Sequence, residues 1–256
     1  MSLELPPVGL GTMGVEDPAV IANAIDLGYR HLDTAQIYRN EAVVGEGIAR
    51  SAVERDDLVV ATKVWADSLE PAAVHESTRE SLERLGLDRV DLLYVHRPIE
   101  TYDPPRTLSA LEELREAGLI DHIGLSNFTP AAIDTAHECL ESPIAAHQVE
   151  FHPLYHESDV LDQARAHGFP LVAYSPLVAG RAEELPPVTE IAAARGVHPA
   201  VISLAWVLSH EGVVAIPKAS SSAHLEANLA AADITLDDSE RQRISSLDTT
   251  EELFPE

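Results

Sequence analysis

Short runs of β-branched and apolar residues alternate with longer amphipathic stretches along this sequence, and no other feature constrains its fold as strongly. Such an alternation is typical of βα units arranged around a parallel sheet. We count eight units. The predicted strands are Val8 to Thr12, His31 to Ala35, Leu58 to Val64, Val90 to His96, His122 to Ser126, Ala146 to Phe151, Pro170 to Ser175 and Val213 to Ala219.

Helices are predicted to fill the intervals between these strands. Two lie before the eighth strand and two follow it: Val188 to Arg195, Pro199 to His210, Ala223 to Ala232 and Asp237 to Leu247. Proline in a first turn and glycine after a last turn mark helix ends. These signals are Pro18, Pro71, Pro130, Pro199, Gly28, Gly86, Gly118, Gly168 and Gly196. The longest irregular stretch, 178–187, is predicted to be a loop over the mouth of the sheet.

Eight strands that each precede a helix form either a closed barrel or an open doubly wound sheet. In a barrel the active site lies at the carboxyl ends of the strands, so polar residues should gather there. Nearly every predicted strand ends in one: Asp33, Lys63, His96, Ser126, Asn127, Gln148, Glu150, Tyr174, Ser175 and Lys218. We therefore predict an α/β protein with a (β/α)8 TIM barrel, and a single domain over residues 1–256.

The segment from Gly9 to Gly14 spells G-x-G-x-x-G, and Asp33 lies 22 residues beyond Gly11. This spacing also suggests the ribose acid of a Rossmann dinucleotide site. However, Pro6-Pro7 interrupts the strand that should precede the motif, and no helix begins at Gly14. We favour a tight first turn at the mouth of a barrel.

The charge balance disfavours two classes of partner. The chain has 17 Lys and Arg against 43 Asp and Glu, a net charge of −26 that repels nucleic acid and anionic membranes. Acidity spread over the helices favours adaptation to a very salty cytoplasm, where screening weakens self-repulsion. The lone Cys139 cannot form an internal disulfide, and we find neither an export signal nor an apolar run of about 18 residues. We expect a cytoplasmic protein.

A dense motif runs from Gly28 to Glu41, out of a helix, through a strand and into the next loop. With the motifs that follow it in order, it resembles the aldo-keto reductase family, and in particular its short members similar to 2,5-diketo-D-gluconate reductases. The other motifs are Thr62 to Trp65, Asp91 to Pro98, Gly124 to Phe128, His147 to Glu150, Ala173 to Leu177 and Ile216 to Lys218. The resemblance covers nearly the whole chain, and implies a barrel that reduces small aldehydes or ketones with a nicotinamide cofactor.

The resemblance implies four catalytic residues, Asp33, Tyr38, Lys63 and His96. Carbonyl reduction needs a hydride at carbon, which the nicotinamide supplies, and a proton at oxygen. Tyr38 would be the proton donor, and because a free tyrosine has a pKa of about 10, a cation beside it must stabilise the phenolate. Lys63 would be that cation, Asp33 would keep it charged, and His96 would orient the carbonyl.

Cofactor contacts are implied in the same way. Ser126, Asn127 and Gln148 match residues that hold the nicotinamide carboxamide, and Tyr174 matches the ring that stacks on the nicotinamide. The remaining cofactor positions are Gly11, Thr12, Asp33, Ser175, Leu177, Lys218, His224 and Asn228. Lys218, which precedes serines and a helix N-terminus, is also a sound phosphate site on physical grounds.

Several positions depart from the family pattern. Ala219, His224 and Ala227 stand where the family has serine, arginine and glutamate near the adenosine. Because His224 offers less charge and no bidentate fork, we expect NADP(H) to be favoured but NAD(H) to be possible. Arg97 stands beside His96 where the family often has tryptophan. The long C-terminal loop of some members is predicted to be missing, which leaves a short, open pocket for small carbonyls, lined by Met13, Trp65, His96 and Phe128.

Other interpretations stay open. The barrel could be a non-catalytic cofactor sensor, like potassium channel β subunits, or an isomerase or aldolase in which Lys63 or Lys218 forms a Schiff base. The second would leave Tyr38 and Asn127 without a role. We predict no metal site, because His147, His152 and His156 form no helical i, i+4 pair. The expected partner is a small carbonyl compound, and the resemblance favours a monomer.

Overall fold

The computed structural model describes residues 3–247 and 249–255 and contains one eight-stranded sheet, in which all neighbours are parallel and the order follows the sequence. The strands are β1 (Leu10–Gly11), β2 (His31–Asp33), β3 (Val59–Val64), β4 (Val90–Val95), β5 (Ile120–Ser126), β6 (Ala146–Glu150), β7 (Leu171–Tyr174) and β8 (Val213–Ala215). The sheet closes on itself, because Val8 forms a parallel bridge with Ala215 and Gly9 N donates to Ala215 O over 2.8 Å. The predicted barrel is confirmed.

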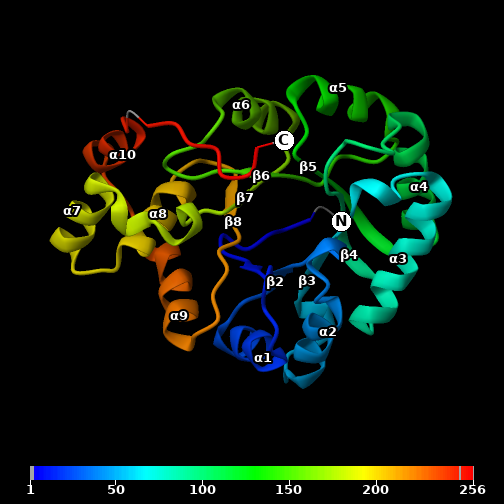
Figure 1. Cartoon of the computed structure of the whole chain (residues 1–256), viewed down its shortest axis with the longest axis horizontal. Helices are drawn as coiled ribbons and strands as arrows, with labels where there is room; N and C mark the ends of the chain where they lie inside the picture. Colours follow the sequence, from blue (N-terminus) through cyan, green and yellow to red (C-terminus); the bar gives the residue numbers. More distant parts are fainter. Residues whose placement is uncertain (1–2, 248, 256) are drawn as a thin grey trace.

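Helices surround the strands (Figure 1). They are α1 (Pro18–Leu27), α2 (Glu41–Arg50), α3 (Pro71–Leu85), α4 (Pro104–Glu116), α5 (Pro130–Cys139), α6 (Ser158–His167), α7 (Pro186–Arg195), α8 (Pro199–Leu208), α9 (Ser222–Ala230) and α10 (Asp238–Ser245). Short 3-10 turns complete the set: η1 (Gln36–Tyr38), η2 (Arg55–Asp57), η3 (Ala66–Ser68), η4 (Val178–Gly180), η5 (Ala182–Glu184) and η6 (Ala231–Asp233). The C-terminal segment, red in Figure 1, leads from α10 back across the strands.

The helix ends follow the local signals. Pro18, Pro71, Pro130 and Pro199 each lie in a first turn, where a missing N–H costs nothing. Gly28, Gly86, Gly168 and Gly196 each cap a helix in the left-handed conformation. Gly118 lies one residue past the cap of α4 and is also left-handed. The predicted loop over 178–187 contains η4 and η5 and ends where α7 begins.

The two strands that close the barrel are shorter than predicted. Pro217 has no N–H to donate, so the ladder of β8 ends at Ala215, although Gly11 N still donates to Pro217 O over 3.2 Å. The first strand pairs with its neighbour only at Leu10 and Gly11, and α1 does not begin until Pro18. The glycine-rich segment is therefore a turn at the barrel mouth and no Rossmann element.

Two apolar clusters make the core. The larger one lies between strands and helices, and the smaller one fills the barrel interior with Ala61, Leu92, Tyr94, Ala146, Val172, Val214 and Ile216. Gly124 makes room for the Tyr94 ring, since a Cβ there would lie 2.4 Å from Tyr94 Cδ1. Toward the carboxyl ends of the strands, beyond this smaller cluster, the inward-facing residues become polar. The apolar cluster therefore closes the barrel interior, which is open at the carboxyl ends of its strands.

Among the described residues, no single helix has both the length and the apolar composition needed to cross a membrane. Helices α7 and α8 meet these two criteria only when the bent pair is taken together.

Candidate active site

A cavity of about 490 Å³ lies at the carboxyl ends of the strands. Most of the residues singled out in the sequence line it: Gly11, Thr12, Met13, Asp33, Tyr38, Trp65, His96, Ser126, Asn127, Gln148, Tyr174, Ser175, Leu177 and Lys218. Lys63 is fully buried beneath it. Phe128 lies elsewhere, in the wall of a neighbouring cavity, and His224 and Asn228 do not line the cavity.

An ion pair between Lys63 and Asp33 forms the floor of this cavity. Lys63 Nζ contacts Asp33 Oδ1, and it also donates to the Thr34 carbonyl over 2.8 Å. The other carboxylate oxygen of Asp33 accepts a hydrogen bond from Gln148 Nε2 over 2.7 Å. Both oxygens of the carboxylate are thus held, and its orientation is fixed before any ligand arrives.

Tyr38 lies above this pair, with its ring centroid 5.2 Å from Lys63 Nζ. Burial raises the pKa of Tyr38 and outweighs the opposite effect of the Lys63 charge, so the phenol stays protonated near neutrality. Burial by itself would lower the pKa of Lys63, but Asp33 and Tyr38 together raise it. The resting site therefore combines a charged lysine with a neutral tyrosine, which is the protonation state that a proton donor requires.

His96 faces Tyr38 and Trp65 edge-on, with ring centroids 6.0 Å and 5.0 Å away. Burial first, and then the charges of Lys63 and Arg97, lower the pKa of His96 to about 2. The imidazole is thus neutral at any working pH. It can hold a polar ligand by hydrogen bonding, but it cannot serve as a cationic acid.

The turn that carries Tyr38 is tied to the rest of the site by Gln36. Its side-chain oxygen accepts from Trp65 N over 3.0 Å, and its Nε2 donates to Ser81 Oγ on α3 over 3.1 Å. Gln36 lies within the motif from Gly28 to Glu41, but its role could not be predicted from the sequence, because Ser81 lies on a helix 45 residues along the chain.

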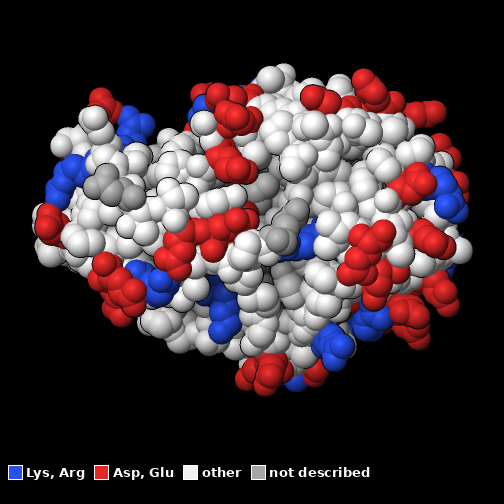
Figure 2. Space-filling model, turned by 45° about the horizontal axis from the view of Figure 1, so that its top comes forward, with Lys and Arg blue, Asp and Glu red and all other residues white. Residues whose placement is uncertain are grey.

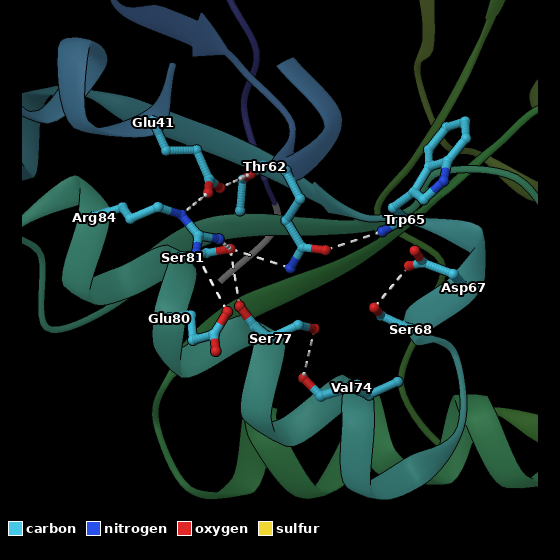
Figure 3. A network of polar contacts seen from close by, with 11 residues as sticks. Glu41, Thr62, Trp65, Asp67, Ser68, Val74, Ser77, Glu80, Ser81 and Arg84 are labelled. Carbon is cyan, nitrogen blue, oxygen red and sulfur yellow. Dashed lines mark hydrogen bonds and ion pairs between the residues drawn. The ribbon is translucent and has the colours of Figure 1, made fainter. Parts of the chain in front are cut away.

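A buried carboxylate extends this network, which is drawn in Figure 3. Glu41, at the start of α2, accepts from Thr62 Oγ1 over 2.6 Å and from Arg84 Nε over 2.8 Å. Arg84 also donates to Ser81 Oγ over 3.1 Å. Hydrogen bonds thus run without a break from the outer surface of α3 to η1, the turn that carries Tyr38, and to the strand that bears Lys63.

On the other side of the cavity, three predicted cofactor residues bond to one another. Asn127 Nδ2 donates to the His96 carbonyl over 3.0 Å and to Ser126 Oγ over 3.1 Å. Its side-chain oxygen accepts from the Tyr174 hydroxyl over 3.0 Å. Asn127 itself has a φ of 59°, a left-handed conformation that asparagine tolerates better than most residues. One side chain thereby positions β4, β5 and β7 around the cavity.

The loop after β7 has unusual backbone strain. Ser175, Val178 and Ala179 all have φ near +50°, and Val178 is β-branched, for which this conformation is costly. Lys218 is exposed at the same edge, and α9 begins at Ser222 behind the Ser221 cap. This edge therefore combines strained backbone, a lysine and a helix N-terminus, as phosphate sites do.

The last described residues add a wall that sequence reasoning missed. Glu150 accepts hydrogen bonds from Leu253 N over 2.6 Å and from Phe254 N over 3.0 Å. Phe254 then lines the cavity and meets the Tyr174 ring edge-on at 5.8 Å. We predicted an open pocket at this point. The difference arises because the buried Glu150 carboxylate on β6 holds the C-terminal segment across the mouth of the barrel. The one signal for this wall in the sequence is an aromatic residue, Phe254, close to the C-terminus.

Phe128 follows β5 in the sequence, but it does not line the predicted substrate pocket. It is buried and packs edge-on against Tyr102 at 5.4 Å, so its ring turns away from the cavity above Lys63. His147, one of the histidines considered for a metal, accepts a hydrogen bond from Phe128 N. Among the described residues, no group of three or more His, Cys, Asp or Glu side chains is arranged to hold a metal ion.

The residues of the cavity fit a nicotinamide group. The cavity has a volume of about 490 Å³, which is in the range of small-ligand pockets. Amide and hydroxyl side chains lie opposite Tyr38 and His96. In this barrel a protonated tyrosine lies above a buried Lys–Asp pair and beside a pocket of this kind. Such a site is typical of enzymes that move a proton to or from a bound ligand.

Comparison with known proteins specifies that class. The sequence pattern of the Aldo/keto reductase family matches residues 7–249. Methylglyoxal reductase DkgB of Salmonella typhimurium is 37% identical over an alignment 257 residues long, which covers 98% of this chain and 96% of that protein. The chain therefore belongs to the aldo/keto reductase family.

Solved structures agree. One provisionally named 2,5-diketo-D-gluconic acid reductase B has a TM-score of 0.91 at 37% identity, covering 94% of this chain and 87% of its own. Aldose reductase from Schistosoma japonicum has a TM-score of 0.93 at 28% identity, covering 98% of this chain and 91% of its own. The protein is an oxidoreductase that reduces carbonyl groups with a nicotinamide cofactor, as the family resemblance implied.

Proposed function

We propose that Tyr38 is the general acid of this reduction and that Lys63, Asp33 and His96 support it. The observation that carries the proposal is the fully buried Lys63–Asp33 pair beneath a tyrosine whose pKa is raised by burial. The tyrosine keeps its proton until a carbonyl oxygen gains negative charge, and Lys63 then stabilises the phenolate that is left behind. Neutral His96 donates a hydrogen bond to the same oxygen and sets its angle.

The nicotinamide cofactor supplies the hydride when it is bound. Ser126, Asn127 and Gln148 would hold its carboxamide, and Tyr174 would stack on its ring. The hydrogen bond from the Tyr174 hydroxyl to Asn127 Oδ1 supports this assignment, because it holds the ring and the amide together, and Asn127 Nδ2 in turn donates to the His96 carbonyl. Gly11, Thr12, Ser175 and Leu177 would complete the nearer contacts, with His224 and Asn228 toward the adenosine.

NADP(H) is the favoured form of the cofactor, and NAD(H) remains usable. Lys218 is exposed beside the serines that precede α9, so it can meet a phosphate. His224 is also exposed, in the first turn of that helix, and an imidazole contributes less to binding a 2′-phosphate than the bidentate guanidinium of an arginine would. We therefore expect a modest preference.

The substrates are small aldehydes, ketones and dicarbonyls. Methylglyoxal is supported by the relative named for it, and the walls formed by Met13, Trp65 and Phe254 favour a short substrate. Phe254 belongs to the C-terminal segment that Glu150 holds by a hydrogen bond. Steroid-sized compounds would require this tail to move.

The acidic surface suggests a salty cytoplasm as the place of action. Figure 2 shows Asp and Glu in clusters over the visible face, with Lys and Arg as separate groups between them. Salt would screen the repulsion that a net charge of −26 creates. We propose a monomeric, cytoplasmic enzyme whose stability and activity rise with salt; full activity in low-salt buffer would count against the salt adaptation.

The assignment is tested by following the absorbance of reduced nicotinamide with a panel of small aldehydes and diketones, in high salt, for wild type and Tyr38→Phe. Each is measured with NADPH and with NADH, and cofactor binding is followed separately by protein fluorescence. We expect turnover to vanish in the variant while cofactor binding persists. Cofactor binding by the wild type without turnover of any carbonyl would instead support a sensor.

A further inference from the structure

We propose that Tyr94 is a positioning residue for Lys63: the face of its ring supports the buried ammonium from the barrel interior and keeps it beside Asp33 and Tyr38. The proposal rests on the proposed function, in which Lys63 stabilises the phenolate of Tyr38. It adds a residue that does not line the cavity and that acts through Lys63 alone.

Tyr94 and Lys63 are direct partners in the sheet. Strands β3 and β4 pair so that Lys63 lies opposite Tyr94, and side chains at paired positions point to the same face, here the barrel interior. Both side chains are fully buried. Lys63 Nζ lies over the Tyr94 ring, 5.9 Å from its centroid, and 5.2 Å from the centroid of the Tyr38 ring. The ammonium therefore has one tyrosine ring on the cavity side and another in the barrel interior.

A buried ammonium needs protein groups in place of water. Asp33 Oδ1 and the Thr34 carbonyl oxygen accept from Lys63 Nζ, which has three N–H donors. Burial by itself would lower the pKa of Lys63. The face of an aromatic ring carries partial negative charge and attracts a cation within about 6 Å of its centroid, most strongly where water is excluded. The Tyr94 ring thus favours the charged form of Lys63 without adding a second anion to the site.

The ring of Tyr94, and not its hydroxyl, makes this contact. The hydroxyl is buried and forms no hydrogen bond with any residue that the structure describes. Burial and the charge of Asp33 raise the pKa of Tyr94 well above its usual range, and the Gln148 side chain opposes this only in part. The phenol is therefore neutral, and it lies outside the cavity, so it cannot deliver a proton to a ligand. An unpartnered buried hydroxyl costs stability, whereas the ring face serves Lys63.

Gly124 fixes the ring from the other side. Strand β5 places Gly124 opposite Tyr94, and a Cβ there would lie 2.4 Å and 2.5 Å from two carbons of the ring. The ring therefore fills the space between the ammonium and the β5 backbone. A smaller side chain at position 94 would leave a cavity into which Lys63 could withdraw from Tyr38. Because the attraction between the ammonium and a phenolate falls with distance, this withdrawal would slow proton donation.

The competing explanation is that Tyr94 merely fills the barrel. Leu92 provides a matched control, because it lies two residues earlier on β4, is fully buried and belongs to the same interior cluster. Its partners in the sheet are Ala61 and His122, and not Lys63. A truncation at Leu92 thus opens the same core without removing a ring from the ammonium.

The first experiment measures the contact without turnover. Tyr94→Phe is compared with pentafluorophenylalanine at position 94, because fluorine withdraws electrons and makes the ring face repel a cation. Urea unfolding is followed for both proteins, and for both in the background Asp33→Asn/Lys63→Met, which has no ammonium. We expect the fluorinated ring to lower the urea midpoint only where Lys63 is present. Tyr94→Phe itself should unfold at a higher urea concentration than wild type, because it lacks the unpartnered hydroxyl.

The second experiment measures the consequence for catalysis, with methylglyoxal and NADPH in high-salt buffer. We expect kcat of Tyr94→Phe to stay within about twofold of wild type, and kcat of Tyr94→Leu and Tyr94→Met to fall at least about tenfold. The dissociation constant of the cofactor, followed by protein fluorescence, should change less than about twofold in all three. Leu92→Ala should lose stability but keep kcat within about threefold.

Four results would overturn the proposal: an equal effect of the fluorinated ring with and without Lys63, an unchanged kcat in Tyr94→Leu, the same loss of kcat in Leu92→Ala, or the same loss in Tyr94→Phe, which would assign the role to the hydroxyl. Failure of the proposed function looks different, because wild type would then reduce no carbonyl. The urea experiment would still decide whether Tyr94 supports the charge of Lys63.

Discussion

Gln148 Nε2 donates a hydrogen bond over 2.7 Å to Asp33 Oδ2, although the two residues lie 115 positions apart in the sequence. The bond links a side chain expected to bind the cofactor to the carboxylate that keeps Lys63 charged. A movement of Gln148 would therefore also disturb the Asp33–Lys63 pair, on the side of the cavity where we propose that Tyr38 donates its proton. This hydrogen bond links the two sides of the site.

This pairing makes Asp33 important for stability as well as activity. In Asp33→Asn, the buried Lys63 loses its counter-charge, so we expect the free energy of unfolding to fall by about 3–5 kcal/mol. Turnover should fall by about a hundredfold or more. Urea unfolding and steady-state kinetics measure the two effects. The double variant Asp33→Asn/Lys63→Met should recover much of the stability and none of the activity; recovery of activity would contradict the role of the pair.

Buried histidines make the fold sensitive to acid. Burial lowers the pKa of His31 to about 4, of His147 to about 3 and of His96 to about 2. In the unfolded chain these groups bind protons below pH of about 6.5, whereas in the folded protein they stay neutral, so their contribution is present above that pH and is lost as pH falls. Each should remove about 1.4 kcal/mol per pH unit.

Urea unfolding at constant salt, in steps from neutral pH down to about pH 4, would measure this slope. His31→Leu should make the decline shallower, because one of the three groups is removed. A free energy of unfolding that stays constant over this range would show that the histidines are not neutral in the fold.

The hydrogen bonds of Gln36 should matter for turnover more than for cofactor binding. In Gln36→Ala, the turn that carries Tyr38 loses its ties to Trp65 and Ser81, so we expect kcat to fall about tenfold while the dissociation constant of the cofactor stays within about twofold. Gln36→Glu keeps the acceptor for Trp65 N and should recover part of the loss. Glu80→Gln, which alters only the exposed end of the network, serves as the control.

The interior of the barrel offers a test of packing. A methyl group on Gly124 would meet the Tyr94 ring at 2.4 Å, so Gly124→Ala should lower the free energy of unfolding by about 1–3 kcal/mol. Because the conflict is with that ring, Gly124→Ala/Tyr94→Leu should be more stable than Gly124→Ala. Thermal and urea unfolding measure both. Additive losses in the double variant would mean that Gly124 is required for another reason.

Local signals predicted the helices well. A proline fixes φ at a first turn and a glycine adopts a left-handed cap without help from distant residues, so Pro71 and Gly86 place the ends of α3 correctly from the sequence. The grouping of the polar residues at strand ends was equally predictable, because the carboxyl ends of all the parallel strands of a barrel lie at the same rim. The apolar and polar alternation was thus enough for the fold and for most of the site.

Contacts between segments that are distant in the sequence could not be predicted from local signals. Gln36 meets Ser81 across 45 residues, and Glu41 meets Arg84 across 43. Glu150 holds Phe254 across 104 residues, and this contact gives the cavity a wall whose position depends on tertiary structure. Phe128, near the end of its strand, turned out to face a different cavity, since its rotation depends on Tyr102.

The sequence by itself determined the order of the elements, the ends of the helices and the ring of polar groups, because each of these depends on residues within a few positions of one another. The tertiary structure decided which polar groups pair, which protonation states burial imposes on Tyr38 and His96, and where the chain returns to cover the cavity. These depend on the closure of the barrel, which brings together side chains that have no relation along the chain and removes them from water.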